Sequence, residues 1–282
     1  MDKNLFHSQS AKLRRLIIAS IYEAGSGHPG GALSAIDIIN YLLCSKKIKK
    51  IKSNFILSKG HAAPAFYAAA ALNKWINLRE LSKLRKIDSL LQGHPSISQT
   101  PWVNSSTGSL GQGFSVAVGK ALGFKHQNKN ENIYVMLGDG EVQEGEVWEA
   151  AMCAAKFNLD NLCAIIDYNK LQSDDFNKSI MNIEPLKNKW EAFNWEVIEI
   201  NGHDFDEIKI ALEQKFLNSQ KPFLIIAHTI KGKDVSFMEN VPAWHGSVKI
   251  KDEELVNALQ ELNTDKKEIE KILDGTFWEN NE

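Results

Sequence analysis

The chain has 282 residues, which is long enough for one large domain or two small ones with a sizeable core. Its composition, 43% hydrophobic and 24% charged residues, is that of an ordinary soluble globular protein. The 33 Lys and Arg residues nearly balance the 35 Asp and Glu residues, and the net charge of -2 argues against binding to nucleic acid or to a membrane surface. The basic cluster Lys46–Lys50 is an exception, which we interpret as a solvated loop or helix end.

Cysteine usage and the absence of long apolar runs indicate a cytoplasmic protein. Cys44, Cys153 and Cys163 lack metal-type spacing and lie in apolar sequence, so we expect them to be reduced core residues. No signal peptide is visible, and no apolar run approaches the length that a bilayer requires.

The N-terminal part of the chain is predicted to be mainly helical. Apolar residues at helical spacing predict helices over residues 8–24 and Leu33–Leu43. The sequence "NFILS" predicts a short buried strand. Two further helices, Ala62–Leu72 and Leu110–Gly123, are rich in alanine and glycine, and such small side chains would let another helix approach closely.

From Ile133 onward, apolar runs rich in β-formers alternate with helical patterns. This order predicts a parallel sheet with helices on both faces, an α/β fold. The last thirty residues, about 250–282, are charged and predict a helical surface appendage. No linker divides the chain, so we expect a single domain over residues 1–282. The predicted strands cover residues 133–137, 162–167, 195–200 and 222–228, and the predicted helices cover 141–157, 185–193 and 204–217.

Histidine follows glycine at His28, His61, His94 and His203, and the first three are spaced by 33 residues. That period is the length of an ankyrin repeat, so a helical repeat binding module is an alternative. The sequence after His94, "PSISQTPWVNSSTGS", cannot form the required helix pair, and we therefore disfavour this alternative. No two histidines have zinc-type spacing.

An isolated histidine is usually a hydrogen-bonded core or turn residue. A neighbouring glycine leaves the flank of the imidazole uncovered, which favours a ligand-binding loop. For His203 we keep the structural interpretation, because "NGHD" is typical of a strand-to-helix turn in which Asp204 caps the helix.

Two oxygen ligands follow successive predicted strands. Asp139 ends one strand in the sequence "GDGE", and Asn169 ends the next in "YNKLQ". Ligands of open α/β sheets bind at the carboxyl ends of the strands. Magnesium takes oxygen donors and is usually held by one or two protein groups together with phosphate oxygens. The pair therefore predicts a site for a metal-bridged diphosphate.

These two motifs resemble the thiamine-diphosphate motif, and further segments resemble transketolase. The matching segments follow the order of that family and cover nearly the whole chain: "SGHPGGALS", "LSKGHAAPAFYA", "GHPS", "TGSLGQGF", "TIKGKDVSFMEN" and "WHG". The match is to the N-terminal, diphosphate-binding domain. It implies the thiamine-diphosphate-binding fold, with thiamine diphosphate and magnesium as cofactors.

The resemblance also implies roles for individual residues. The magnesium ligands would be Asp139, the side chain of Asn169 and the carbonyl of Leu171. The residues that bind or adjoin the cofactor would be Gly108, Ser109, Leu110, Gly140, His61, Lys231 and His245. The residues that orient the sugar's hydroxyls and carbonyl would be His28, His94 and His245, so that the catalytic set is His28, His61, His94 and His245.

Three further positions follow from the comparison with the family pattern. Glu144 matches a glutamate that is thought to couple active sites across the subunit interface, while its alternative role is to stabilise a helix N-terminus. Tyr168 stands where the motif often has an asparagine that is not a ligand. Asp234 stands where "KGKG" usually has glycine, and we expect it to alter that loop near the diphosphate.

The implied activity is transfer of a two-carbon ketol unit from a ketose phosphate to an aldose phosphate. Transketolases also need a pyrimidine-binding domain, whose glutamate activates the cofactor, and 282 residues leave no room for it. We therefore expect this chain to be the N-terminal subunit of a split transketolase, active only with a complementary C-terminal subunit in a two-plus-two heterotetramer. The alternatives are a related subunit with a specialised sugar substrate and an enzyme that resembles deoxyxylulose-phosphate synthase.

Overall fold

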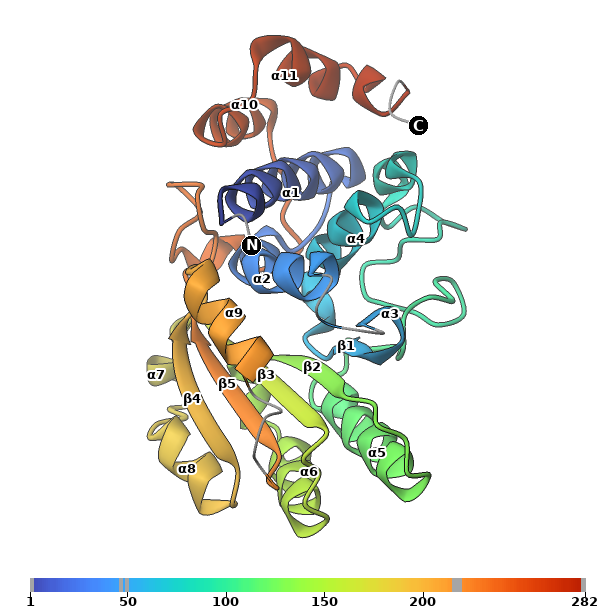
Figure 1. Cartoon of the computed structure of the whole chain (residues 1–282). Helices are drawn as coiled ribbons and strands as arrows, with labels where there is room; N and C mark the ends of the chain where they lie inside the picture. Colours follow the sequence, from blue (N-terminus) through green and yellow to red (C-terminus); the bar gives the residue numbers. More distant parts are fainter. Residues whose placement is uncertain (1–2, 46–47, 49–50, 215–219, 280–282) are drawn as a thin grey trace.

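The computed structural model describes residues 3–45, 48, 51–214 and 220–279 (Figure 1). Its centre is a five-stranded sheet in which every neighbouring pair is parallel. The strand order is β1-β2-β3-β5-β4. The strands are β1 (Phe55–Leu57), β2 (Ile133–Gly138), β3 (Leu162–Tyr168), β4 (Glu196–Asn201) and β5 (Phe223–His228).

Helices cover both faces of this sheet, as the alternating pattern predicts (Figure 1). Alternate residues of each strand point into different cores, so Tyr134 and Met136 pack on one side and Val135 and Leu137 on the other. The first core contains residues of α1 (Lys3–Ala24), α2 (Pro29–Cys44), α4 (Ala63–Leu72) and α9 (Phe205–Gln214). The second contains residues of α5 (Gln112–His126), α6 (Gly145–Lys156) and α8 (Leu186–Ala192).

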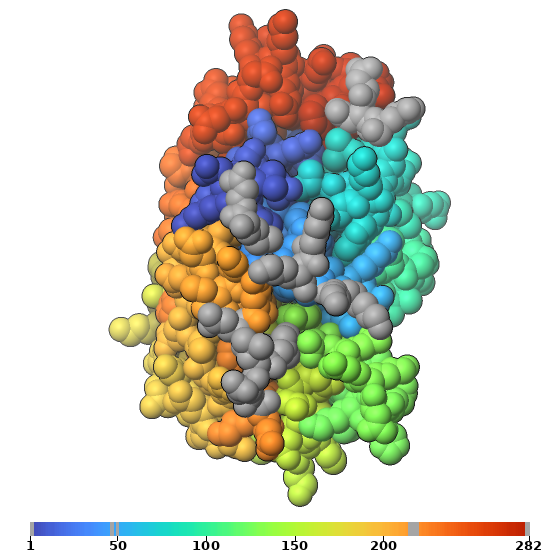
Figure 2. Space-filling model, in the orientation of Figure 1, coloured from blue at the N-terminus to red at the C-terminus, as the bar shows by residue number. Residues whose placement is uncertain are grey.

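The C-terminal helices α10 (Asp252–Glu261) and α11 (Lys266–Leu273) lie over α1, on the side away from the sheet (Figure 1). In the space-filling view they form one end of the molecule, shown in red next to the blue N-terminal helix (Figure 2). Their buried side chains, such as Leu255 and Ile269, belong to the same core as α1. Two short helices, α3 (Ile51–Asn54) and α7 (Asn177–Ile180), and several 3-10 turns complete the described part of the chain.

Two expectations about helices need correction. The helix expected from Glu141 begins only at Gly145, because Gly140–Gln143 forms a 3-10 turn. The alanine-rich helix α4 cannot receive a partner, because it is packed against α1 and α2 and its residues up to Ala71 are buried. The small side chains of α4 serve contacts within the chain instead.

Several smaller predictions concern local features. Asp204 caps α9, since its Oδ1 accepts hydrogen bonds from the backbone of Asp206 at 2.7 Å and Glu207 at 3.3 Å, which confirms the expected turn. The three cysteines are free; Cys163 is buried and the other two are partly buried. Four of the five residues of the cluster Lys46–Lys50, all its lysines, lie outside the described residues. Within the described ranges, no helix combines the length and the apolar character needed to cross a membrane.

Candidate active site

The candidate site lies at the carboxyl ends of the adjacent strands β2, β3 and β5. Asp139 directly follows β2, Asn169 directly follows β3, and Lys231 comes three residues after β5. Because parallel strands end at the same edge of a sheet, these residues meet around a cavity of about 290 Å³. The predicted residues that line this cavity are His28, His61, His94, Gly108, Leu110, Asp139, Gly140, Glu144, Asn169, Leu171, Lys231 and His245. Ser109 is exposed and does not line it.

The three predicted oxygen ligands are each held by hydrogen bonds. The Asp139 carboxylate accepts from the backbone nitrogens of Gly140 at 2.8 Å and Lys170 at 2.5 Å. Asn169 Oδ1 accepts from the backbone nitrogen of Leu171 at 3.1 Å, and the Leu171 carbonyl accepts from Lys231 Nζ at 2.8 Å. These bonds fix the positions of the two side chains relative to the loop that joins them.

The chemistry of this donor set fits a hard cation. Asp139 is only 2% exposed and forms no ion pair with any residue that the structure describes. Burial, with the charge of Asp167 as a second cause, raises the pKa of Asp139 to about 6. A bound cation would compensate this buried charge, and carboxylate, amide and carbonyl oxygens are the ligands that magnesium prefers. The described residues contain no group of three His, Cys, Asp or Glu that would form a site of another type.

A buried ion pair that sequence reasoning missed lies beneath these ligands. Lys59 Nζ donates to the carboxylate of Asp167, and both side chains are at most 1% exposed. Asp167 also accepts from the hydroxyls of Ser34 and Thr229 and from Asn169 Nδ2 at 3.2 Å. Burial alone would raise the pKa of Asp167, but the charge of Lys59 lowers it below the ordinary value. The pair therefore links β3 to the loop after β1 and positions the amide of Asn169.

Glu141 is a second residue that was missed, although it stands in the "GDGE" motif. Its carboxylate accepts from the Ser58 hydroxyl at 2.5 Å and from the backbone nitrogens of Gly111 at 2.9 Å and Gly138 at 3.0 Å. Burial raises its pKa. One side chain thus connects the ends of β1 and β2 to the start of α5, which explains the 3-10 turn at this position.

The four predicted catalytic histidines form one cluster. The ring centroids of His28 lie 5.7 Å from His61, 5.8 Å from His94 and 5.9 Å from His245, and those of His61 and His245 are 5.2 Å apart. Burial is the largest cause of a lowered pKa at all four, and the pKa falls to about 4 at His28 and about 3 at His245. All four imidazoles are therefore neutral at neutral pH, and each can both donate and accept a hydrogen bond.

Lys231 lies between the histidine cluster and the oxygen ligands. Its Nζ donates to His245 Nδ1 at 2.7 Å as well as to the Leu171 carbonyl. Since His245 Nδ1 accepts this bond, its Nε2 carries the proton and is a donor. Burial and the charge of Lys59 lower the pKa of Lys231 to about 8, which leaves it a cation at neutral pH.

Glycines at three positions make room for these imidazoles. A Cβ on Gly246 would lie 2.2 Å from His28, one on Gly31 would lie 2.9 Å from His61, and one on Gly108 would lie 2.9 Å from His94. Gly108 also has a φ of 134°, which side chains rarely adopt. The glycines that precede the histidines in sequence also lie close to other groups, such as Ile21 at Gly27.

The remaining singled-out residues lie around the site. His203 Nδ1 lies 2.7 Å from Asp37, and its Nε2 accepts from the backbone of Ile230 at 2.9 Å, so it is a structural residue outside the cavity. Glu144 is exposed at the cavity and is the N-cap of α6, without a capping hydrogen bond from its side chain. The hydroxyl of Tyr168 donates to Glu184.

Asp234 adopts the left-handed conformation, with a φ of 69°, at the position where the family pattern has glycine. Its carboxylate lies 3.2 Å from Arg14 Nε and does not line the cavity. The departure therefore affects the contact of this loop with α1.

Comparisons with known proteins agree with this geometry. The family described as "Transketolase, thiamine diphosphate binding domain" matches residues 7–274. The 6-deoxy-6-sulfo-D-fructose transketolase subunit SqwG of a Clostridium species is 40% identical, with 90% of this chain and 94% of that protein covered. An apulose-4-phosphate transketolase subunit of Phocaeicola vulgatus is 36% identical, with 98% and 100% covered. The crystal structure of transketolase from Campylobacter jejuni aligns with a TM-score of 0.85 at 31% identity, over 100% of this chain and 49% of that one.

Proposed function

The chain belongs to the transketolase family through the thiamine diphosphate-binding domain, and we propose that it forms the diphosphate-binding half of a two-chain transketolase. This proposal rests on one observation. Asp139, Asn169 and Lys231 line the same cavity as four neutral histidines. The relatives named as subunits match this chain over 94% and 100% of their own length. A second polypeptide then supplies the groups that activate the cofactor.

Magnesium is the proposed metal. Asp139, Asn169 Oδ1 and the Leu171 carbonyl would hold it, and phosphate oxygens would fill further positions. Lys231, a buried cation next to the Leu171 carbonyl, would neutralise part of the diphosphate charge. When bound, thiamine diphosphate supplies the carbon nucleophile and the electron sink that ketol transfer requires.

The histidine cluster is proposed to bind the sugar and to transfer protons. As the C2–C3 bond of the donor ketose breaks, its C3 hydroxyl becomes an aldehyde and gives up a proton. Neutral His28 and His94 lie side by side and can accept that proton, which a protonated imidazole could not do. His245, whose Nε2 is a donor, would hydrogen-bond the C2 oxygen. The same groups return the proton when the acceptor aldehyde takes the ketol unit.

The sugar is proposed to be a ketose that carries a terminal anionic group. One relative is named for 6-deoxy-6-sulfo-D-fructose and another for apulose 4-phosphate. A sulfonate and a phosphate are both anions at the end of a short sugar, so a specialised substrate of this class is favoured over a general sugar metabolite.

The partner chain is proposed to dock on α5, next to the cavity. Val116 is 44% exposed, and added Cβ atoms at Gly119 and Gly123 would meet nothing within 4 Å. These residues form one exposed side of α5, and Leu110, which is also exposed, connects that side to the cavity. Assembly of two copies of each chain would bury upwards of about 2,000 Å² at each obligate interface.

The test is hydrogen–deuterium exchange at the thiazolium carbon of the cofactor, measured before any sugar is added. With this chain alone the rate should match that of the free cofactor. With the partner chain it should rise by orders of magnitude, and ketol transfer should appear. Rapid exchange and ketol transfer by this chain without a partner would contradict the two-chain proposal.

A further inference from the structure

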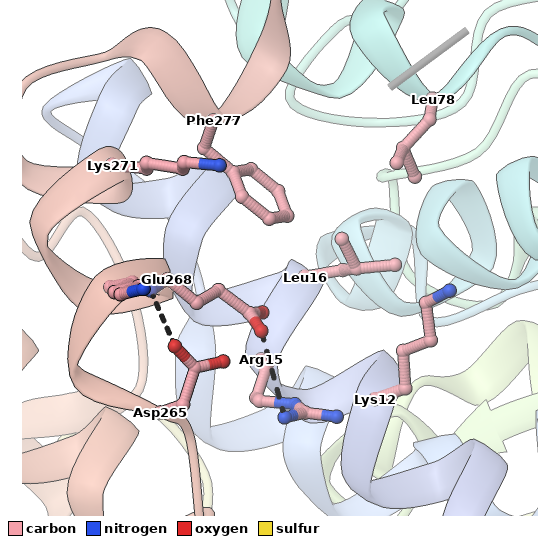
Figure 3. Close-up of a pocket in the computed structure, with 9 residues that line it drawn as sticks. Lys12, Arg15, Leu16, Leu78, Asp265, Glu268, Lys271 and Phe277 are labelled. Atoms are coloured by element: carbon pink, nitrogen blue, oxygen red, sulfur yellow. Dashed lines mark hydrogen bonds and ion pairs between the residues drawn. The ribbon is translucent and has the colours of Figure 1, made fainter. Parts of the chain in front are cut away.

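A second cavity, of about 560 Å³, lies between α1 and the C-terminal segment (Figure 3). Its walls are α1, α11 and two 3-10 turns, one beginning at Leu78 and the other, Thr276–Trp278, carrying Phe277. None of its lining residues lines the candidate active site. Its size lies within the range of about 300–1,000 Å³ that is usual for small-molecule sites.

The rim of this cavity is basic. Lys12 and Arg15 come from α1, and Lys267 and Lys271 come from α11, against two acidic residues, Asp265 and Glu268. Four cations and two anions leave a net charge of +2 around the cavity. In the described part of the chain the three lysines form no ion pair, and the Asp265 carboxylate is engaged as the N-cap of α11. The cavity therefore attracts an anion.

Arg15 is only loosely paired at this site. Its Nε is buried and has no hydrogen-bond partner. Its contact with Glu268 is long, at 3.9 Å from Nη1 to Oε2 (Figure 3). The side chain of Arg15 is 23% exposed and lines the cavity, so its positive charge is available to a ligand there.

The interior of the cavity is apolar. Leu16, Leu78 and the ring of Phe277 are the apolar side chains that line it (Figure 3). An adjoining hollow of about 650 Å³ shares Lys12, Leu16 and Leu78 and adds the indole of Trp75 and another cation, Lys74. An inorganic anion would leave this apolar surface in water, whereas a ligand with a flat ring would cover it.

We propose that this cavity binds a nucleotide, with its phosphate on the basic rim at Arg15 and its base against Phe277 and Leu16. The positive rim and the apolar surface are each matched by one part of such a ligand. A nucleotide here would connect α11 to α1. Both walls are close in sequence to residues of the active site, because α1 ends four residues before His28 and the C-terminal segment follows His245. Gly27 and Val248 join these two segments by a pair of backbone hydrogen bonds at 3.2 and 3.1 Å.

The test is calorimetric titration of the full chain, assembled with its partner and saturated with thiamine diphosphate and magnesium, so that the diphosphate site is filled. Adenosine monophosphate and inorganic phosphate are the probes. The variant R15Q/K271Q should bind adenosine monophosphate at least about tenfold more weakly, which is about 1.4 kcal/mol. K266Q is the matched control, because Lys266 lies on the same helix and does not line the cavity.

Phe277→Ala distinguishes binding of the base from binding of the phosphate. It should weaken the binding of adenosine monophosphate and leave that of inorganic phosphate unchanged. Amide hydrogen exchange should show protection of residues 266–273 by adenosine monophosphate. The proposal is overturned if millimolar adenosine monophosphate gives no binding, if R15Q/K271Q binds it as the unmodified chain does, or if the partner chain itself fills the cavity.

Discussion

Lys59 and Asp167 form an ion pair under the candidate metal ligands, and neither side chain is more than 1% exposed. The two residues come from the loop after β1 and from β3, which are not adjacent strands. The Asp167 carboxylate has four hydrogen-bond donors around it, so its charge is well compensated. Such a pair fixes geometry more than it adds stability, because removing both charges from water is costly.

Removing one partner of this pair should be strongly destabilising. Lys59→Met leaves the Asp167 carboxylate buried without its cation, and the expected cost is about 3–5 kcal/mol of unfolding free energy. Urea unfolding measures it. Lys83→Met, which breaks the exposed pair with Glu80, is the control and should cost less than about 1 kcal/mol. A loss below about 1 kcal/mol in Lys59→Met would contradict this account.

The fold could be predicted from the sequence because its signals are local. The strands of the sheet are apolar runs separated by helical patterns, and such runs occur when both faces of a parallel sheet are buried. The position of Asp139 and Asn169 followed from the same rule, since each ends a strand. The packing of α4 could not be predicted, because small side chains suit a contact within the chain as well as one between chains.

The interior of the site depends on contacts between distant segments. Asp167 is the last residue of the run "LCAIID", and in the sequence it reads only as the end of a strand. Its partner is 108 residues away. Glu141 differs, because it stands within the "GDGE" motif at the end of a strand, where its carboxylate accepts from the neighbouring backbone of Gly138. The glycines that face the histidines were also beyond prediction, since each faces a histidine from another loop.

Gly246→Ala should impair catalysis by displacing His28. The added methyl group would lie 2.2 Å from His28 Cδ2, so the ring must move. Displacement of a catalytic group by about 1 Å can cost about 100-fold, and we expect kcat/KM to fall by roughly 10- to 100-fold. Cofactor affinity should change little. Steady-state kinetics and cofactor titration of the assembled enzyme measure both values.

Gly145→Ala is the control for this variant, because an added Cβ at Gly145 meets nothing within 4 Å. It should retain nearly normal kinetics. Normal turnover in Gly246→Ala would show that His28 is not held by this contact.

Acidification should destabilise the protein through His28. Its pKa is about 4 in the folded chain, mainly because of burial, against 6.5 for the free side chain. The unfolded chain therefore binds the proton more tightly, and the contribution of neutral His28 to stability is complete above about pH 6.5 and lost as the pH falls toward about 4. Urea midpoints of the chain should fall over this window. The fall should be smaller in His28→Asn, and equal falls in both proteins would refute this assignment.

Asp139→Ala should abolish magnesium-dependent cofactor binding and leave the fold intact. The carboxylate is the one anionic group among the three proposed ligands, so its loss leaves an amide and a carbonyl oxygen, which bind magnesium weakly. Calorimetry of thiamine diphosphate binding to the assembled enzyme, with magnesium and with a chelator, measures the effect. In the unmodified enzyme magnesium should strengthen binding, and in Asp139→Ala the two titrations should coincide.

Asp160→Ala, at an exposed aspartate paired with Lys125, is the control and should behave as the unmodified enzyme does. A circular dichroism spectrum and melting profile close to the unmodified ones would show that Asp139→Ala is folded. Unchanged magnesium-dependent affinity in that folded variant would show that magnesium is not bound at this edge of the sheet.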